Sequence, residues 1–205
     1  MPDTLLETVD LVKSFPIRKG FLGRRQQLVA VDGVSLKISK GETLGLVGES
    51  GCGKSTLGLT IMRLYEPTSG QVLIDGQDIA ALEAADMRQA RRQMQMIFQD
   101  PFASLDPRMS VANIIREPLD LHGIGTPAER SAEVRRLLRL TGMPSDAAVR
   151  LPNEFSGGQQ QRIGIARALA LQPKLLICDE PVSSLDVSVQ AQILNLLRDC
   201  RPSSG

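Results

Sequence analysis

The feature that most constrains this chain is a glycine-rich segment between an apolar run and a helix-forming run. Residues 48–55 are GESGCGKS, a complete G-x-x-x-x-G-K-[ST] pattern. The apolar residues 43–47 before it predict a short strand, and residues 57–64 after it predict an apolar helix. Glycines allow backbone N–H groups to converge on phosphate oxygens, and a helix start adds favourable partial charge. The sequence therefore predicts a phosphate-binding loop in an α/β fold.

Each position of this loop has an expected role toward ATP and Mg²⁺. We expect Lys54 to reach the β- and γ-phosphates, Ser55 to ligate Mg²⁺ and Thr56 to bond the α-phosphate. The other predicted nucleotide-binding residues of the loop are Gly48, Glu49, Ser50, Gly51, Cys52 and Gly53. Cys52 is interpreted as a small filler rather than a redox sensor.

A second motif, residues 175–180, places two acids after four residues typical of a buried strand. Ligands bind at the carboxyl ends of strands in open parallel sheets. Asp179 is expected to hold Mg²⁺, and Glu180 to act as a general base toward water. Together with the first motif, this pattern predicts a P-loop NTPase, and the N-K-x-D motif of small GTPases is not found.

Composition excludes several other classes of protein. With one histidine, His122, and three widely spaced cysteines, a zinc site of Cys/His type is nearly excluded. A net charge of +1 and 3% aromatic residues give no reason to expect a nucleic-acid partner. No apolar run approaches the ~18 residues of a membrane span, and the N-terminus lacks a signal-peptide pattern. We expect a cytoplasmic protein.

The order of the predicted elements indicates one domain over residues 1–200 and a disordered tail over 201–205. Residues 5–11 predict an edge strand, and residues 29–38 and 72–74 predict further strands. A basic segment, residues 16–27, is interpreted as a solvated hairpin loop, with contact to a membrane-side partner or to acidic lipid as the alternative. An all-helical insertion is expected near residues 104–155, with Ser110 and Thr126 as N-caps. The last predicted strand is 175–178 and the last helix is 187–199.

A third motif, FSGGQ at residues 155–159, opens another predicted helix. Glycines after a serine N-cap supply backbone donors suited to an anion. The motif resembles the signature of ATP-binding cassette (ABC) ATPases, usually LSGGQ. The resemblance implies that Ser156, Gly157, Gly158 and Gln159 bind the γ-phosphate of ATP held by the opposite subunit. It also implies the family's fold, an ABC-type P-loop core whose mixed or parallel sheet carries N-terminal antiparallel strands, with a helical insertion.

Three further residues match weaker family motifs. Gln99 resembles the Q-loop glutamine, which implies contact with Mg²⁺ and the attacking water. Asp186, in Ser184–Asp186, resembles the D-loop that touches the partner's site. Phe15 resembles the aromatic residue that stacks on adenine, and a core phenylalanine is the alternative.

Longer phrases, such as EFSGGQQQRIGIARAL and CDEPVSSLDVSVQAQILNLL, are similar to ATPase subunits of bacterial oligopeptide and dipeptide importers. The resemblance is to the second of their two ATPases. It implies a transport-coupled ATPase that pairs with a second ABC subunit and with membrane permease subunits, peripheral on the inner face of the plasma membrane. Related importers move nickel or glutathione, so the transported solute stays open.

Family members usually continue further, through more strands and a switch histidine. His122 precedes the signature and does not match that position, which leads to the hypothesis that this chain is C-terminally truncated and lacks those strands. An ATP-binding remnant with little or no hydrolysis is therefore one alternative function. A non-transport ABC ATPase is a second, which the short spacing from Gln99 to Ser156 disfavours.

Overall fold

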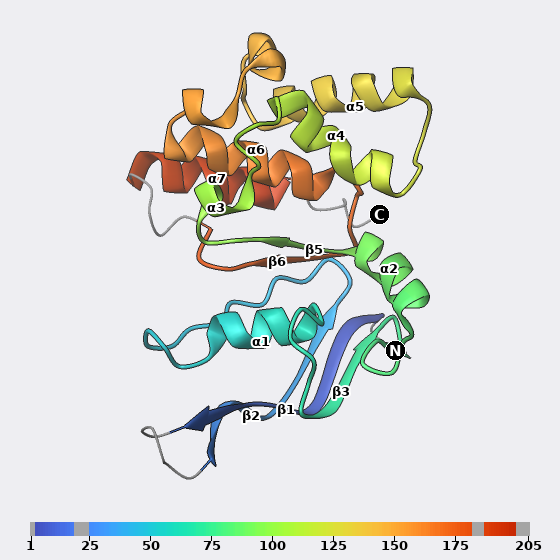
Figure 1. The fold of residues 1–205 in the computed structure, drawn as a ribbon, viewed down its shortest axis with the longest axis vertical. Helices are drawn as coiled ribbons and strands as arrows, with labels where there is room; N and C mark the ends of the chain where they lie inside the picture. The colour runs from blue at the N-terminus through green and yellow to red at the C-terminus, as the bar shows by residue number, and fades with distance from the viewer. Residues whose placement is uncertain (1–2, 19–24, 182–186, 200–205) are drawn as a thin grey trace. The chain divides into compact units, whose positions relative to one another are not determined.

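The computed structural model describes residues 3–18, 25–181 and 187–199. Two compact units divide the chain, Met1–Arg91 and Arg92–Gly205. The first unit contains most of the strands, and the second most of the helices (Figure 1). The prediction of one domain over residues 1–200, with a helical part near 104–155, stays a prediction.

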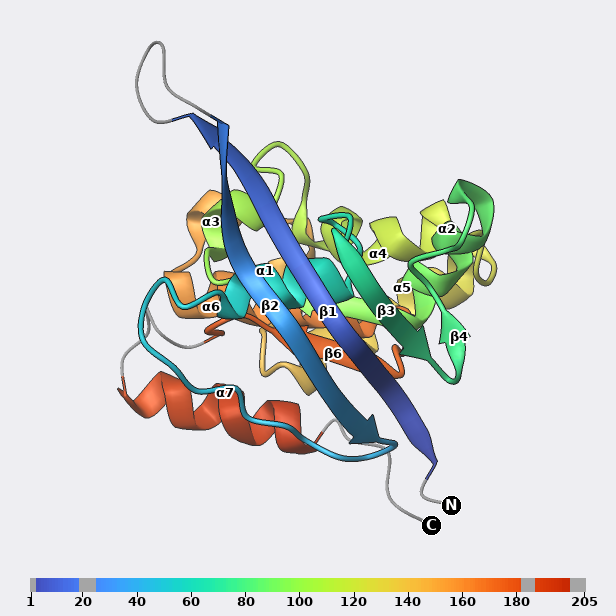
Figure 2. The same ribbon diagram turned by 90° about the horizontal axis from the view of Figure 1, so that it is seen from below.

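An antiparallel sheet forms the body of the first unit. Its strands are β1 (Thr4–Arg18), β2 (Arg25–Ser39), β3 (Ser69–Ile74) and β4 (Gln77–Asp78), in the spatial order β2-β1-β3-β4. Figure 2 shows the long β1 and β2 side by side, with β3 along the other side of β1. The predicted antiparallel N-terminal strands are therefore confirmed.

The prediction that residues 5–11 form an edge strand is wrong, because β1 is paired on both sides. Alternation of apolar and polar residues reports one buried face, and an interior antiparallel strand has that pattern as readily as an edge strand. Leu6 and Leu11 are buried, and the Thr8 hydroxyl donates to the carbonyl of Val34 at 2.9 Å. A tight turn at Asp75–Gly76 joins β3 to β4. Both residues have positive φ, as the type I′ turn of a tight hairpin requires.

The strand predicted over residues 43–47 is also wrong. Thr43–Val47 are not assigned to any strand, and Val47 is 94% exposed. A strand is stabilised by hydrogen bonds to its neighbours. Among the described residues, the sheet of the first unit consists of β1 to β4 alone, so this apolar segment has no neighbour in it.

One helix lies within the first unit, and a second spans the boundary between the two units. Helix α1 (Lys54–Ile61) follows the glycine-rich loop, and Figure 1 shows it beside β1 and β2. Helix α2 (Ala84–Gln93) carries Arg88, Arg91 and Arg92.

The second unit begins with a parallel pair of strands, β5 (Met94–Ile97) and β6 (Leu175–Cys178). Its helices are α3 (Pro101–Ser104), α4 (Val111–Leu121), α5 (Pro127–Leu140), α6 (Gly157–Leu169) and α7 (Val187–Asp199), with short 3₁₀ turns at Ser145–Val149 and Pro152–Glu154. Ile97 of β5, Ile165 of α6 and Ile193 of α7 form one buried cluster.

Capping residues fix where these helices begin, as the sequence predicts. The Ser110 hydroxyl accepts from the N–H of Asn113, and Thr126 forms a capping box with Glu129. The apolar faces of α4, α5 and α6 share one core, which includes Ile115, Leu137 and Ile163. None of the helices in the described part of the chain combines the length and apolar character that crossing a bilayer requires.

Candidate nucleotide-binding site

Left-handed glycines shape the phosphate-binding loop. Gly51 and Gly53 have φ of 80° and 99°, a region that other residues enter only with strain. A Cβ on Gly53 would lie 2.2 Å from the carbonyl oxygen of Ala30. The loop therefore presses against β2 at a place where only glycine fits.

Lys54, the first residue of α1, bends back over this loop. Its Nζ donates to the carbonyls of Gly48 at 2.8 Å and Glu49 at 2.7 Å. No side chain caps the start of α1, so its first-turn N–H groups remain suited to an anionic ligand. All the predicted loop residues lie together in the first unit, from Gly48 to Thr56.

Phe15 lies on the same unit, near the contact between the loop and β2. Its cross-strand partner is Leu28, two residues from Ala30, which corresponds to about 7 Å along a strand. The ring of Phe15 meets that of Tyr65 edge to face, with centroids 5.3 Å apart. Lys13 Nζ lies 4.9 Å from the Phe15 centroid. The sequence alone did not identify Tyr65 and Lys13 as neighbours of Phe15. Tyr65 is distant in the sequence and meets Phe15 only in the folded chain.

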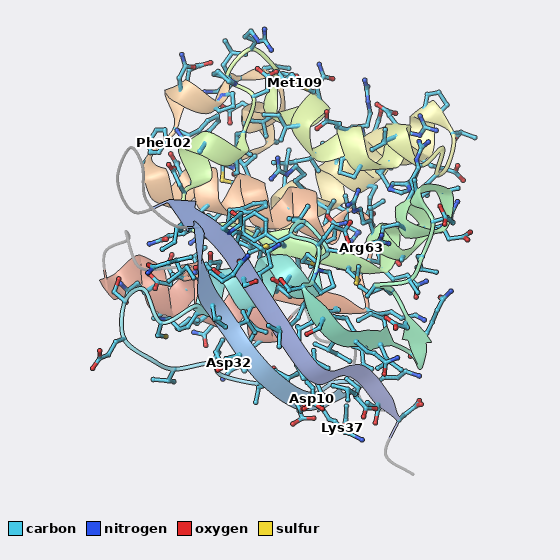
Figure 3. The ribbon with its side chains drawn as sticks, turned by 60° about the horizontal axis from the view of Figure 1, so that its bottom comes forward. Asp10, Asp32, Lys37, Arg63, Phe102 and Met109 are labelled. Carbon is cyan, nitrogen blue, oxygen red and sulfur yellow. The ribbon has the colours of Figure 1, made fainter. Side chains whose placement is uncertain are left out.

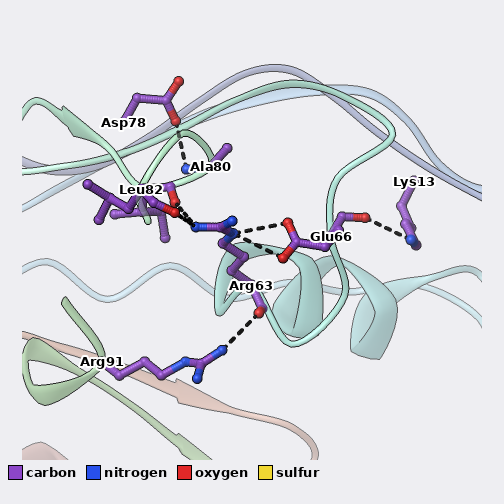
Figure 4. Close-up of polar contacts among 8 residues, drawn as sticks. Lys13, Arg63, Glu66, Asp78, Ala80, Leu82 and Arg91 are labelled. Carbon is purple, nitrogen blue, oxygen red and sulfur yellow. Dashed lines mark hydrogen bonds and ion pairs between the residues drawn. The ribbon is translucent and has the colours of Figure 1, made fainter. Parts of the chain in front are cut away.

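Arg63 fastens the end of α1 to the rest of the first unit (Figure 4). Its guanidinium donates to Glu66 and to the carbonyls of Ile79 and Leu82. Its own carbonyl accepts from Arg91 at 3.3 Å. The helix that begins at the phosphate loop is thus held at its far end by backbone as well as side-chain partners.

The acids of the second motif lie at the carboxyl end of β6, in the second unit. The N–H of Asp179 donates to the carbonyl of Ile97 at 2.9 Å, which continues the pairing of β5 with β6. Gln99 follows β5, and its Nε2 donates to Glu180 Oε2 at 3.1 Å. The structure therefore brings together two predicted catalytic residues that are far apart in the sequence.

Glu180 also has an unusual backbone. Its φ is +44°, in the left-handed region, which costs a residue with a side chain on the order of 1 kcal/mol or more. Such strain is concentrated at functional sites. Asp10, Arg63, Asp75 and Gln172 have a similar φ, so the strain at Glu180 agrees with the role its motif predicts but does not establish it.

The signature residues form the N-terminus of α6. The Ser156 hydroxyl accepts from the N–H of Gln159, and Gln159 Oε1 accepts from the N–H of Ser156 at 3.0 Å, a reciprocal capping box. Gly157 and Gly158 lie in the first turn, where N–H groups have no acceptor within the helix. Ser156 and Gln159 thus fix the conformation of the helix start, and the backbone N–H groups of the two glycines can donate to a ligand.

Asp186 and its neighbours in the D-loop motif lie outside the described residues. Lys54 and Ser55 belong to the first unit, whereas Gln99, Asp179, Glu180 and the signature belong to the second. In the described ranges, no cluster of three or more His, Cys, Asp or Glu side chains is arranged to hold a metal by itself.

The chain has a glycine-rich loop before α1, an acid pair after the parallel strand β6 and two glycines at the start of α6. These are the features of a nucleotide-binding cassette. The chain belongs to the ABC transporter family, whose model matches residues 31–183.

Curated relatives narrow the kind of cassette. The chain is 55% identical over 199 residues to the oligopeptide transport ATP-binding protein AppF of Bacillus subtilis (strain 168), covering 96% of this chain and 60% of AppF. It is 51% identical over 200 residues to OppF of the same organism, an oligopeptide transport ATP-binding protein, covering 97% of this chain and 66% of OppF. The chain thus spans about 60% of the length of AppF.

A solved structure has the same fold. The ATP-binding cassette MJ0796, a dimer in a post-hydrolysis state bound to ADP and Pi, matches with a TM-score of 0.86 at 30% identity. The match covers 98% of this chain and 84% of that chain. The predicted ABC-type fold is therefore confirmed.

Proposed function

We propose that this chain is an ATP-binding and ATP-hydrolysing subunit that powers import of peptides, or a related small solute, through an ABC transporter. The observation that carries the proposal is the phosphate loop itself. Lys54 lies over two loop carbonyls, and Gly53 is pressed against β2. The names of AppF and OppF support peptide import over a non-transport role.

The first unit binds the nucleotide. When phosphate enters the loop, Lys54 exchanges its two carbonyl partners for β- and γ-phosphate oxygens, since an ammonium prefers an anion to a neutral acceptor. The N–H groups of residues 48–56 donate to the same phosphates. Phe15 stacks on adenine through the ring face that Lys13 does not cover, and Tyr65 packs edge to face with it.

The residues present fit Mg²⁺, because all three candidate ligand side chains offer oxygen. Ser55, Asp179 and Gln99 would hold the ion together with the phosphates. Bound there, it offsets phosphate charge in the transition state.

Glu180 accepts the proton of the attacking water. The water oxygen then forms a bond to the γ-phosphorus, and the bond from that phosphorus to the β–γ bridging oxygen breaks with its electrons going to ADP. The side-chain Nε2 of Gln99 donates to the Glu180 carboxylate and holds it in place.

The partner is a second ABC ATPase subunit, identical or different. Each site then combines the phosphate loop of one subunit with Ser156–Gln159 of the other, and Asp186 touches the partner's site. The dimeric state of MJ0796 supports this arrangement. The uncapped amides of Gly157 and Gly158 supply the donors toward the γ-phosphate.

Transmembrane permease subunits are the second kind of partner, which places the protein peripherally on the inner face of the plasma membrane. The segment Phe102–Arg108, just after Gln99, carries the coupling. Phe102 is 64% exposed, and Figure 3 shows it on the second unit, as it does Met109. An exposed aromatic ring beside the catalytic glutamine suits contact with a permease.

Nucleotide binding tests the proposal directly. Lys54→Ala removes the phosphate contact, and the surface variant Lys37→Ala, which loses only an ion pair with Glu7, is the control. Calorimetric titration with Mg·ATP should give binding for the wild-type protein and Lys37→Ala, and none for Lys54→Ala. Equal binding by all three proteins would contradict the assignment.

A further inference from the structure

The loop before the signature is a tight turn. The N–H groups of Glu154 and Phe155 donate to the carbonyls of Leu151 and Pro152, each at 3.1 Å. Phe155 is the last residue before the Ser156 cap, and its ring is buried in the core of the helical segment. The direction of the signature amides therefore depends on how firmly the turn at 151–155 is held.

Arg150 holds this turn from one side. Its guanidinium lies 4.4 Å from the centroid of the Phe155 ring. Its Nη2 donates to the carbonyl of Glu154 at 3.0 Å, and its Nε to Glu154 Oε2 at 3.2 Å. The Arg150 carbonyl accepts from the N–H of Val111, at the start of α4, so the residue is itself tied to the helical core.

Gln160 holds the turn from the other side. Its side chain is 1% exposed, and its Nε2 donates to the carbonyls of Pro152 at 2.9 Å and Phe155 at 3.1 Å. Its Oε1 is buried and has no hydrogen-bond partner among the residues that the structure describes. An unsatisfied buried acceptor is unfavourable, so the stabilisation that Gln160 gives the turn comes from its two Nε2 hydrogen bonds.

The aromatic residue at position 155 gives this arrangement its chemistry. Phenylalanine presents a ring face that attracts a guanidinium, whereas leucine at the same place fills the core without that attraction. The stacking of Arg150 therefore depends on phenylalanine standing at position 155 in place of the usual leucine.

We propose that Arg150 and Gln160 are positioning residues for the signature: they fix the backbone of residues 151–155 and so aim the amides of Gly157 and Gly158 at the partner's nucleotide. The inference rests on the proposed function. It adds that the strength of the interaction between subunits is set by two side chains outside the motif.

The first test measures the turn without any partner. Amide hydrogen exchange of the full chain is compared for the wild-type protein, Arg150→Met, Gln160→Met and the control Arg116→Met, which loses only an ion pair with Asp120 on α4. Exchange of the Glu154 and Phe155 amides should be about tenfold faster in the first two variants and unchanged in the control. Unchanged exchange in Arg150→Met and Gln160→Met would overturn the proposal.

The second test measures the signature in trans. Affinity for Mg·ATP should be unchanged in Arg150→Met, while ATP-dependent dimerisation of the Glu180→Gln background should weaken about tenfold, equivalent to about 1.4 kcal/mol. Mixing Arg150→Met with Lys54→Ala should restore one composite site, from the intact loop of the first and the intact signature of the second. A merely structural defect would not be rescued in this way.

Two outcomes keep this inference separate from the proposed function. If the wild-type protein does not dimerise with ATP, the proposed function fails, and hydrogen exchange alone decides the role of Arg150 and Gln160. If it dimerises and Arg150→Met behaves like Arg116→Met, the positioning role is overturned. Should Arg150→Met not fold, Phe155→Leu removes the stacking while keeping an apolar core residue and is expected to weaken dimerisation in the same direction; no weakening would overturn the role.

Discussion

The side-chain amide of Gln99 donates a 3.1 Å hydrogen bond to the carboxylate of Glu180, although 81 positions separate the two residues in the chain. The parallel pairing of β5 with β6 produces this contact, because Ile97 lies opposite Cys178. Gln99 comes shortly after Ile97, and Glu180 shortly after Cys178. The position of the candidate base therefore depends on the glutamine that donates to it.

Replacing Glu180 by glutamine should abolish hydrolysis while ATP binding persists. A general base contributes about 100-fold or more to a rate, and glutamine keeps the size of the side chain but accepts no proton. Phosphate release and Mg·ATP titration measure the two properties in an assembled transporter. Glu133→Gln, which loses an ion pair with Arg136, is the control, and undiminished turnover in Glu180→Gln would refute the role of the base.

Gln99→Ala should lower turnover more than it lowers the affinity for Mg·ATP, because Gln99 holds the Glu180 carboxylate and is only one of three proposed Mg²⁺ ligands. The Glu180 carboxylate would lose the hydrogen bond from Gln99, and a misplaced base costs on the order of tenfold to a hundredfold. Steady-state kcat and KM separate the two effects. Gln71→Ala, which breaks an exposed bond to Asp78, should leave both constants alone; a change confined to KM in Gln99→Ala would contradict the prediction.

Gly53→Ala should destabilise the first unit and eliminate nucleotide binding. The new Cβ would meet the Ala30 oxygen at 2.2 Å, and alanine would also be forced to a φ of 99°. Strain of this kind costs about 1–3 kcal/mol, visible as a fall in the free energy of unfolding. Gly45→Ala, whose Cβ would meet nothing within 4 Å, is the matched control, and equal stability of the two variants would count against the close contact.

Phe15→Ala should weaken binding of ATP more than that of inorganic tripolyphosphate, which has no base to stack. Stacking of a base on an aromatic ring is worth about 1–3 kcal/mol. Leu28→Ala, at the exposed cross-strand partner, controls for the strand. An equal loss for both ligands would favour a structural role for Phe15.

The N-terminus of α5 should weaken in acid. The N–H of Thr126 donates to Glu129, and this bond holds the pKa of Glu129 below its ordinary 4.5. Because the folded-state pKa is lowered, the stabilisation is present above about pH 4.5 and is lost as the pH falls through the lowered value. Circular dichroism melts should show Glu129→Gln less stable than the wild-type protein near neutral pH, with the difference disappearing in acid; a constant difference would contradict the linkage.

The sequence predicted best where local chemistry decides the structure. Ser110, Thr126 and Ser156 cap the helices expected of them, because a cap needs only its own next few residues. The bounds of α7 and β6 follow from their apolar patterns for the same reason. Glycine and lysine spacing likewise marked the phosphate loop.

Pairing between distant segments could not be predicted. The alternation in β1 indicated a strand but not its two neighbours, and the apolar run at 43–47 indicated a strand that the described residues do not pair. The residues next to Arg150 in the sequence do not indicate that its guanidinium lies over the Phe155 ring. Long-range contacts of this kind are set by tertiary packing.

The bonds of Arg63 have a practical consequence for protein engineering. The turn at residues 79–82 exposes Ala81, and an exposed turn would ordinarily be chosen for a tag, a fluorescent reporter or new chain termini. In this turn the carbonyls of Ile79 and Leu82 accept from Arg63, which follows the end of α1. An insertion there would therefore disturb the helix that starts at the phosphate loop. Reporters are better placed away from these two carbonyls.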